Sequence, residues 1–180
     1  MSLKSLLFKI YKKSNIENIL DFSLNIEKPL AIRIPKDTPY SYKFSNYEYG
    51  KWNKVREGNK YMIIACGVMF SEVMKIEKEI GELLDAAIVS AAWIRPFDIE
   101  FIKKEFPKFK KVIILEDGIE KSGFGTEILE YVNDLDIDTK IIRKGIKQKF
   151  LPHAKRSELL EEEKLTGKSL LDDILMKVRD

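Results

Sequence analysis

Apolar residues in this chain form short runs that alternate with amphipathic stretches. Three of the runs are rich in β-branched residues and end in glycine or proline, at 61–67, 87–98 and 112–118. Apolar residues at helical spacing follow each run, as in the range 69–82. This repeated order of strand, turn and helix predicts an α/β fold built on a parallel sheet.

We expect one sheet that is mostly parallel. Its parallel strands are expected near 61–65, 87–92, 112–116 and 139–143, with 52–55 as an antiparallel edge strand. The run at 87–92 is almost wholly apolar, which is typical of a strand covered on both faces. Asp98 suits the N-cap of the helix that follows this run. Further helices are expected around Ile128 to Val132, at 155–163 and at 169–178.

The first 36 residues differ from the rest. Two apolar groups are spaced to suit two short amphipathic helices, the second with Ser14 as its N-cap: Leu6, Leu7, Ile10 and Tyr11, then Ile16, Ile19, Leu20 and Phe22. A short strand bracketed by prolines follows at 29–35. Two helices and one strand cannot close a core, so residues 1–36 are expected to be the tail end of a preceding domain. Residues 37–58 then form a connector with an edge strand, and residues 59–180 the main domain.

Composition adds few constraints. The 180 residues are 44% hydrophobic and 34% charged, with a net charge of +3. No apolar run is long enough to span a bilayer, and a single cysteine fits a reducing compartment, so we expect a cytoplasmic protein without membrane contact. Bases could stack on the aromatic residues of the connector. Basic residues are not concentrated there, however, so nucleic acid is not expected as a partner.

Candidate chemistry lies near the strand ends, and each candidate has a structural alternative. Glu116 and Asp117 are the best-placed carboxylate pair, because sites in α/β proteins form at the carboxyl ends of strands. Acidic residues are also frequent where strands exit to solvent. Cys66 and His153 would need an orienting third group to act as a nucleophilic pair, and a buried cysteine is the commoner case. One cysteine and one histidine offer no zinc site.

Four glycines near strand ends raise the question of phosphate binding: Gly67, Gly118, Gly123 and Gly125. Their spacing does not match the dinucleotide fingerprint, and no glycine-rich loop ends in Gly-Lys-Ser or Gly-Lys-Thr. Glycine also supplies positive φ angles and close backbone approach in tight turns. We therefore favour a turn role for these glycines over a phosphate cradle.

An ordered set of motifs resembles the C-terminal domain of the transketolase family, most closely that of the 1-deoxy-D-xylulose-5-phosphate synthases. The motifs are Gly50-Lys51 through Arg56-Glu57-Gly58, Cys66-Gly67, Arg95-Pro-Phe-Asp98, Glu116-Asp-Gly118 with Ser122-Gly-Phe-Gly125, and Lys144 through His153. The resemblance spans essentially the whole chain. It implies a three-layer α/β domain with a five-stranded sheet, an antiparallel edge strand and helices on both faces. Residues 1–36 would then be the remnant of the pyrimidine-binding domain.

The resemblance also implies what the parent enzyme does. Such synthases use thiamine diphosphate and Mg²⁺ to join pyruvate and glyceraldehyde 3-phosphate, in the isoprenoid precursor pathway. The family's diphosphate–magnesium motif and the segment with the activating glutamate do not occur in this sequence. We therefore expect no catalytic, cofactor or metal residue here, and no activity from the chain alone. Its expected role is packing and dimerisation with the missing N-terminal and pyrimidine-binding domains of the parent, in a homo-oligomer.

One substrate contact is implied by the resemblance. The family's pyrimidine-binding domain ends in Arg-Tyr-Pro-Arg-Gly, whose second arginine helps to hold the substrate phosphate. This chain has Arg33-Ile-Pro-Lys36-Asp37 at that place, so Arg33 and Lys36 are the expected phosphate-binding residues. Lysine binds phosphate as a point charge, without the bidentate fork of arginine. Two alternatives stay open: a free-standing α/β interaction domain, and a fragment of a 2-oxo-acid dehydrogenase β subunit.

Overall fold

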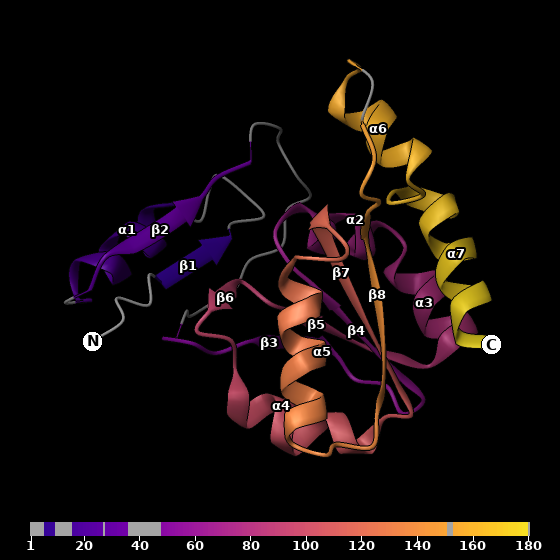
Figure 1. The fold of residues 1–180 in the computed structure, drawn as a ribbon, viewed down its shortest axis with the longest axis horizontal. Helices are drawn as coiled ribbons and strands as arrows, with labels where there is room; N and C mark the ends of the chain where they lie inside the picture. Colours follow the sequence, from indigo (N-terminus) through magenta and orange to yellow (C-terminus); the bar gives the residue numbers. More distant parts are fainter. Residues whose placement is uncertain (1–5, 10–15, 27, 36–47, 151–152, 180) are drawn as a thin grey trace.

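A five-stranded sheet forms the centre of the computed structural model, which describes residues 6–9, 16–26, 28–35, 48–150 and 153–179 (Figure 1). The strand order is β3-β5-β4-β7-β8. β3 runs antiparallel to β5, and the other neighbours are parallel. This arrangement confirms the predicted parallel sheet with an antiparallel edge. The strands are β3 (Asn53–Arg56), β4 (Tyr61–Ala65), β5 (Ala86–Ser90), β7 (Lys111–Ile119) and β8 (Lys140–Ile146).

Helices cover both faces of this sheet, so the three-layer expectation is also confirmed. One face carries α4 (Ile99–Glu105) and α5 (Phe124–Asp134), and the opposite face carries α2 (Val68–Lys75), α3 (Glu77–Leu84) and α7 (Gly167–Arg179) (Figure 1). A short α6 (Arg156–Glu162) lies between β8 and α7 along the chain. A 3-10 turn at Phe106–Lys108 follows α4.

Side chains of the central strands alternate between two hydrophobic clusters. Met62 and Ile64 of β4 pack into the cluster under α4 and α5. Ile63 and Ala65 pack into the cluster under α2, α3 and α7. All four side chains are fully buried. A strand with both faces covered must be apolar at every position, which explains the unbroken apolar runs of the sequence.

The N-terminal residues form a second, smaller sheet together with one strand of the main domain. β1 (Leu6–Lys9) pairs in parallel with β2 (Leu30–Arg33) and antiparallel with β6 (Trp93–Arg95). The helix predicted from Leu6 onward is therefore wrong for residues 6–9. A stretch of three apolar residues followed by Lys9 fits helix and strand equally well by spacing, and pairing with β2 and β6 makes it a strand. The second predicted helix is confirmed as α1 (Ile16–Leu24), and the strand at 29–35 as β2.

Three predicted boundaries are also corrected. The helix expected at 69–82 is divided into α2 and α3, because the backbone at Ile76 leaves the helical region. The strand expected at 87–92 ends at Ser90. Ala91 and Ala92 are buried in the core although they lie outside the strand, so burial rather than pairing accounts for their apolar character.

The third corrected boundary is the end of β7, which reaches Ile119 instead of 116. Gly118 therefore lies within a strand rather than in a turn. A Cβ on Gly145 of β8 would stand 2.7 Å from the carbonyl oxygen of Gly118. Glycine at this place allows the two strands to approach closely where their register shifts.

Asp98 ties the edge strand to the helical layer. Its carboxylate accepts hydrogen bonds from the backbone N–H of Phe101 and of Trp52, both at 3.1 Å. The first bond confirms the predicted N-cap of α4. Lys51 Nζ lies 3.2 Å from the same carboxylate, whose residue is only 5% exposed. Residues 37–47 of the predicted connector lie outside the described residues, as does Ser14.

Candidate functional site

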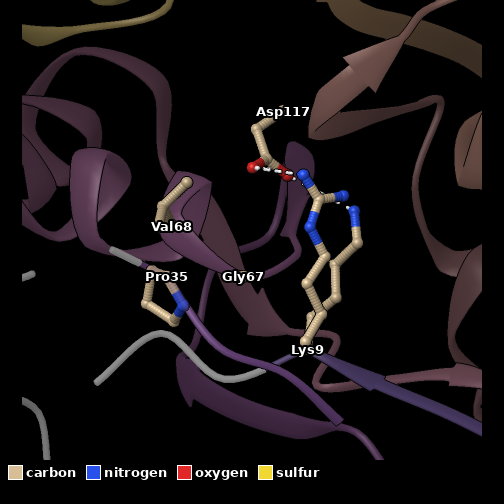
Figure 2. Close-up of a pocket in the computed structure, with 6 residues that line it drawn as sticks. Lys9, Pro35, Gly67, Val68 and Asp117 are labelled. Atoms are coloured by element: carbon tan, nitrogen blue, oxygen red, sulfur yellow. Dashed lines mark hydrogen bonds and ion pairs between the residues drawn. The ribbon is translucent and has the colours of Figure 1, made fainter. Parts of the chain in front are cut away.

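A charged cluster forms where the small sheet meets the carboxyl end of β7. Asp117 is its centre, and three cations from three elements approach the carboxylate. Lys9 Nζ of β1 lies 3.3 Å from Oδ1, and the guanidinium groups of Arg33 in β2 and Arg156 in α6 each lie 3.5 Å from Oδ2. Figure 2 shows Lys9 and Asp117 at this cluster, with dashed lines that mark ion pairs. The cluster therefore connects the N-terminal segment and α6 to the main sheet.

A small cavity of about 20 Å³ opens beside this cluster. Pro35 and Val68 lie across from Lys9 in the view of Figure 2. A cavity of this size holds about one water molecule or one oxygen atom of a ligand. Its lining residues are Lys9, Arg33, Pro35, Gly67, Val68 and Asp117.

Cys66 precedes Gly67, which lines this cavity, and is buried completely. Burial raises the pKa of its thiol to about 12, although the nearby Lys9 acts in the opposite direction. Lys9 Nζ is 3.9 Å from Sγ, whereas His153 is exposed to solvent. A thiol that stays protonated is a poor nucleophile. Cys66 is therefore interpreted as a buried core residue.

Glu116 and Asp117 point to opposite sides of β7, as neighbouring residues of a strand must. Both oxygens of the Glu116 carboxylate accept backbone N–H bonds at the start of α5, from Phe124 at 2.9 Å and from Gly125 at 3.0 Å. Burial raises the pKa of Glu116, and these two hydrogen bonds oppose that rise. The two carboxylates therefore face different surroundings, and Glu116 serves as a cap for α5.

Two of the glycines have clear local roles. Gly67 has φ +56° and is the N-cap of α2 without a side-chain cap. A Cβ on Gly123 would overlap the carboxylate of Glu116. Both observations support the turn and close-approach interpretation over a phosphate cradle formed by the glycines themselves.

A second, larger cavity of about 340 Å³ lies at the N-terminal segment. It is mainly apolar, and two of its aromatic residues border Trp93. The ring centroids of Phe22 and Tyr49 lie 6.0 Å and 5.1 Å from that of Trp93. The lining residues are Phe22, Asn25, Ile26, Lys28 and Tyr49.

The structure tests the sequence-derived site residues only in part. Arg33 lies at the end of β2 with a side chain that is 56% exposed, beside the cavity. Lys36 lies outside the described residues. Sequence reasoning missed Lys9 and Arg156 as neighbours of Asp117. A lysine next to an apolar stretch was the only signal for Lys9, and no sequence spacing links residues 9, 117 and 156.

Two negative findings concern the described part of the chain. Within it, no three His, Cys, Asp or Glu side chains are grouped so that they could hold a metal ion. No helix described here is long and apolar enough to cross a membrane.

Comparison with known proteins connects this geometry to a family. The profile for "Transketolase, C-terminal domain" matches residues 50–170. A 1-deoxy-D-xylulose-5-phosphate synthase from Fusobacterium nucleatum is 35% identical over 148 residues, covering 81% of this chain and 25% of that protein. A synthase of the same name from Clostridium perfringens is 38% identical over 145 residues, covering 78% and 23%. The chain thus spans about a quarter of the length of these curated relatives.

A solved structure shows the same fold at lower identity. It is described as a split gene transketolase, an inactive beta4 tetramer, and it superposes with a TM-score of 0.86 at 19% identity. The match covers 96% of this chain and 57% of that one. This likeness shows the fold, and the sequence profile over residues 50–170 shows the family: the chain belongs to the transketolase C-terminal domain family.

Proposed function

We propose that this chain is the C-terminal part of a thiamine-diphosphate-dependent 1-deoxy-D-xylulose-5-phosphate synthase. The observation that carries the proposal is the 35% to 38% identity to synthases of this name over about four fifths of the chain. The transferase reaction would join pyruvate and glyceraldehyde 3-phosphate with loss of carbon dioxide, in the cytoplasm, to supply isoprenoid precursors. Residues 1–36 would be the tail end of the pyrimidine-binding domain, 37–58 the connector and edge strand, and 59–180 the C-terminal domain.

In this proposal the chain is a packing and dimerisation module, inactive alone. Exposed apolar side chains on the N-terminal segment support the role, because a covering partner would remove them from water. Leu20 is 48% exposed, Leu24 84% and Ile34 47%. The preceding domains of the parent enzyme, or a second subunit, would cover them. The solved relative described as a tetramer is consistent with a homo-oligomer.

Thiamine diphosphate and Mg²⁺ would be bound by the other domains of the parent. The described residues do not fit this cofactor. The cavity at the strand ends admits about one oxygen atom, and the larger cavity is lined by no carboxylate that could hold Mg²⁺. We therefore assign no catalytic, cofactor-binding or metal-binding residue to this chain.

The residues proposed to contact substrate are Arg33 and Lys36, through the phosphate of glyceraldehyde 3-phosphate. Arg33 is held near Asp117, and its guanidinium has donors that face solvent, with 56% of the side chain exposed. Arginine suits phosphate because its planar fork of N–H donors matches two oxygens. Lys36 would add a second positive charge three residues further along the chain.

Product analysis of the complete enzyme tests the proposed reaction. With pyruvate and glyceraldehyde 3-phosphate, we expect carbon dioxide and 1-deoxy-D-xylulose 5-phosphate in equal amounts. Transfer of an acetyl group to a lipoyl acceptor would replace the proposal by the 2-oxo-acid dehydrogenase alternative. No consumption of pyruvate with any acceptor would favour the free-standing interaction domain.

Kinetics of Lys36 variants test the substrate contact. In the complete enzyme, Lys36→Ala should raise KM for glyceraldehyde 3-phosphate by an amount equivalent to about 1–3 kcal/mol, the cost of a lost hydrogen bond between charged groups. Lys36→Arg should restore or improve binding. Lys60→Ala is the control, because Lys60 is exposed at the opposite end of β4. Unchanged kinetics in both Lys36 variants would show that another residue holds the phosphate.

A further inference from the structure

The main sheet reverses its direction of growth between β4 and β7. From β4 the chain continues to the neighbouring β5, and it later returns to add β7 and β8 on the other side of β4. In open α/β sheets a ligand usually binds outside the carboxyl ends of the strands at such a switch point. These ends meet here, because the N–H of Cys66 after β4 donates to the carbonyl oxygen of Leu115 in β7 at 3.1 Å. The small cavity lined by Gly67 and Asp117 therefore lies at the switch point.

The side chain of Lys9 occupies this place. Strand β1 holds it there, since the N–H of Lys9 donates to the carbonyl oxygen of Ala92 at 2.9 Å. Its stem passes close to Gly67, where an added Cβ would lie 3.4 Å from Cδ and 3.5 Å from Cβ of Lys9. Its ammonium lies 3.3 Å from Asp117 Oδ1 and 3.9 Å from Cys66 Sγ. A residue of the N-terminal segment thus fills the position where such sheets bind ligands.

Lysine suits this position because it has an apolar stem and a charged end. The stem packs against the backbone at Gly67, and the charged end reaches an anion. An ammonium taken out of water costs free energy unless an opposite charge accompanies it, and the Asp117 carboxylate supplies that charge. The side chains of Lys9 and Asp117 are only 9% and 12% exposed. Removing Lys9 alone would leave a vacant space beside a carboxylate that water reaches poorly.

We propose that Lys9 is an internal substitute for a ligand and that it closes the switch point of the main sheet. The place opens only when β1 leaves or the Lys9 side chain is removed. The opened place accepts a primary alkylammonium group, because the Asp117 carboxylate lies at its end and the backbone at Gly67 lies along its side. The contact is autoinhibitory: β1 and a ligand of this class are mutually exclusive occupants, so docking of the N-terminal segment controls access to the main sheet.

This inference does not rest on the proposed synthase reaction. It requires neither the cofactor nor the substrate phosphate, so the 180-residue chain itself is the sample. Cys66 provides the readout because it is the single cysteine of the chain, is completely buried and lies beside the Lys9 ammonium. Opening of the switch point exposes this thiol to a small neutral reagent such as methyl methanethiosulfonate.

The rate of Cys66 modification in Lys9→Ala is the first measurement. We expect it to exceed the rate in the unmodified chain at least about tenfold, because losing one charged hydrogen bond raises the open fraction by that factor. Lys144→Ala is the matched control, since it removes another buried lysine that pairs with an aspartate, Asp173 at 3.1 Å, between β8 and α7. A general loss of stability raises both rates alike, whereas opening of the switch point raises only that of Lys9→Ala.

Chemical rescue is the second measurement. n-Propylammonium contains the atoms that Lys9→Ala removes, from Cγ to Nζ. We expect it to slow Cys66 modification in Lys9→Ala in a saturable manner and to leave the rate in Lys144→Ala unchanged. Tetramethylammonium at the same concentration is the control for ionic strength, because it has the same charge, no N–H donor and a broader shape.

Circular dichroism checks that each variant is folded. If Lys9→Ala does not fold, Asp117→Asn gives the result, because it keeps the stem of Lys9 and removes the charge that holds the ammonium. Its modification rate should then exceed that of Lys144→Ala.

Three results would overturn the inference. The first is an equal rate of Cys66 modification in Lys9→Ala and Lys144→Ala. The second is an equal effect of n-propylammonium and tetramethylammonium on Lys9→Ala, which would show a response to ionic strength alone. The third, where Lys9→Ala is unfolded, is a rate in Asp117→Asn no higher than in Lys144→Ala. Each of these results leaves the proposed synthase reaction to be decided by product analysis.

Discussion

The carboxylate of Glu116 occupies the space that a side chain at Gly123 would need. Glu116 is only 3% exposed, and its two oxygens accept the N–H groups of Phe124 and Gly125 at the start of α5. A carboxylate from β7 thus takes the place of an N-cap side chain, and residue 123 must lack a Cβ. The glycine-rich stretch after β7 has a structural reason that needs no ligand.

Replacing Gly123 by alanine should destabilise the fold. The added Cβ must displace the Glu116 carboxylate, which leaves buried N–H groups of α5 without their acceptor. We expect Gly123→Ala to lower the free energy of unfolding by about 2–3 kcal/mol, measured by urea denaturation. Ser122→Ala is the control, because Ser122 is exposed and adjacent. Equal stability of the two variants would contradict the close packing of Glu116 against residue 123.

The thiol of Cys66 should be inert in the folded chain. With a pKa of about 12, only about one thiol in ten thousand is ionised at pH 8, and the thiolate is the reactive form. We expect no reaction with a disulfide reagent at pH 8 within the time that an exposed thiol needs, and complete reaction in denaturant. Rapid modification of the native chain would show that Cys66 is accessible and that its environment is misassigned.

Glu105 should contribute to stability above mildly acidic pH. The hydrogen bond from Lys108 lowers its pKa; burial opposes this effect and Lys54 reinforces it. Since the pKa is lower in the folded chain than in the unfolded one, ionised Glu105 stabilises the fold above the unfolded-state pKa near 4.5. This contribution is lost as the pH falls through the lower folded-state value.

Unfolding of Glu105→Gln at two pH values checks this prediction. We expect the variant to be less stable than the unmodified chain by about 1 kcal/mol at pH 7, and the difference to shrink at pH 3. Glu100→Gln is the control, because the side chain of Glu100 is 75% exposed and lies 4.0 Å from Lys103. A difference for Glu105→Gln that does not change between pH 7 and pH 3 would exclude the ionised pair as its cause.

The main sheet could be predicted from the sequence because its signals are local. Runs such as Tyr61–Ala65 are apolar at every position, and each is followed by a turn and a helix. Asp98 could be placed as an N-cap for the same reason. The N-terminal strand β1 could not be predicted, because its four residues become a strand only by pairing with residues 30–33 and 93–95.

The charged cluster escaped prediction for a related reason. Lys9, Asp117 and Arg156 are separated by 108 and 39 positions, and only the folded chain brings them together. The sequence did place Asp117 at the carboxyl end of a strand, where sites in α/β proteins form. It could not show that Asp117 turns toward cations while Glu116 turns toward α5.

Titration with thiamine diphosphate and Mg²⁺ tests most directly the central claim, that this chain is the part of a thiamine-dependent enzyme that does not hold the cofactor. Two samples are compared by calorimetry, the isolated chain and the complete enzyme. We predict saturable heat from the complete enzyme and none from the isolated chain at the same concentration. Binding of the cofactor to the isolated chain at micromolar concentration would contradict the claim and would mean that the cofactor site lies within these 180 residues.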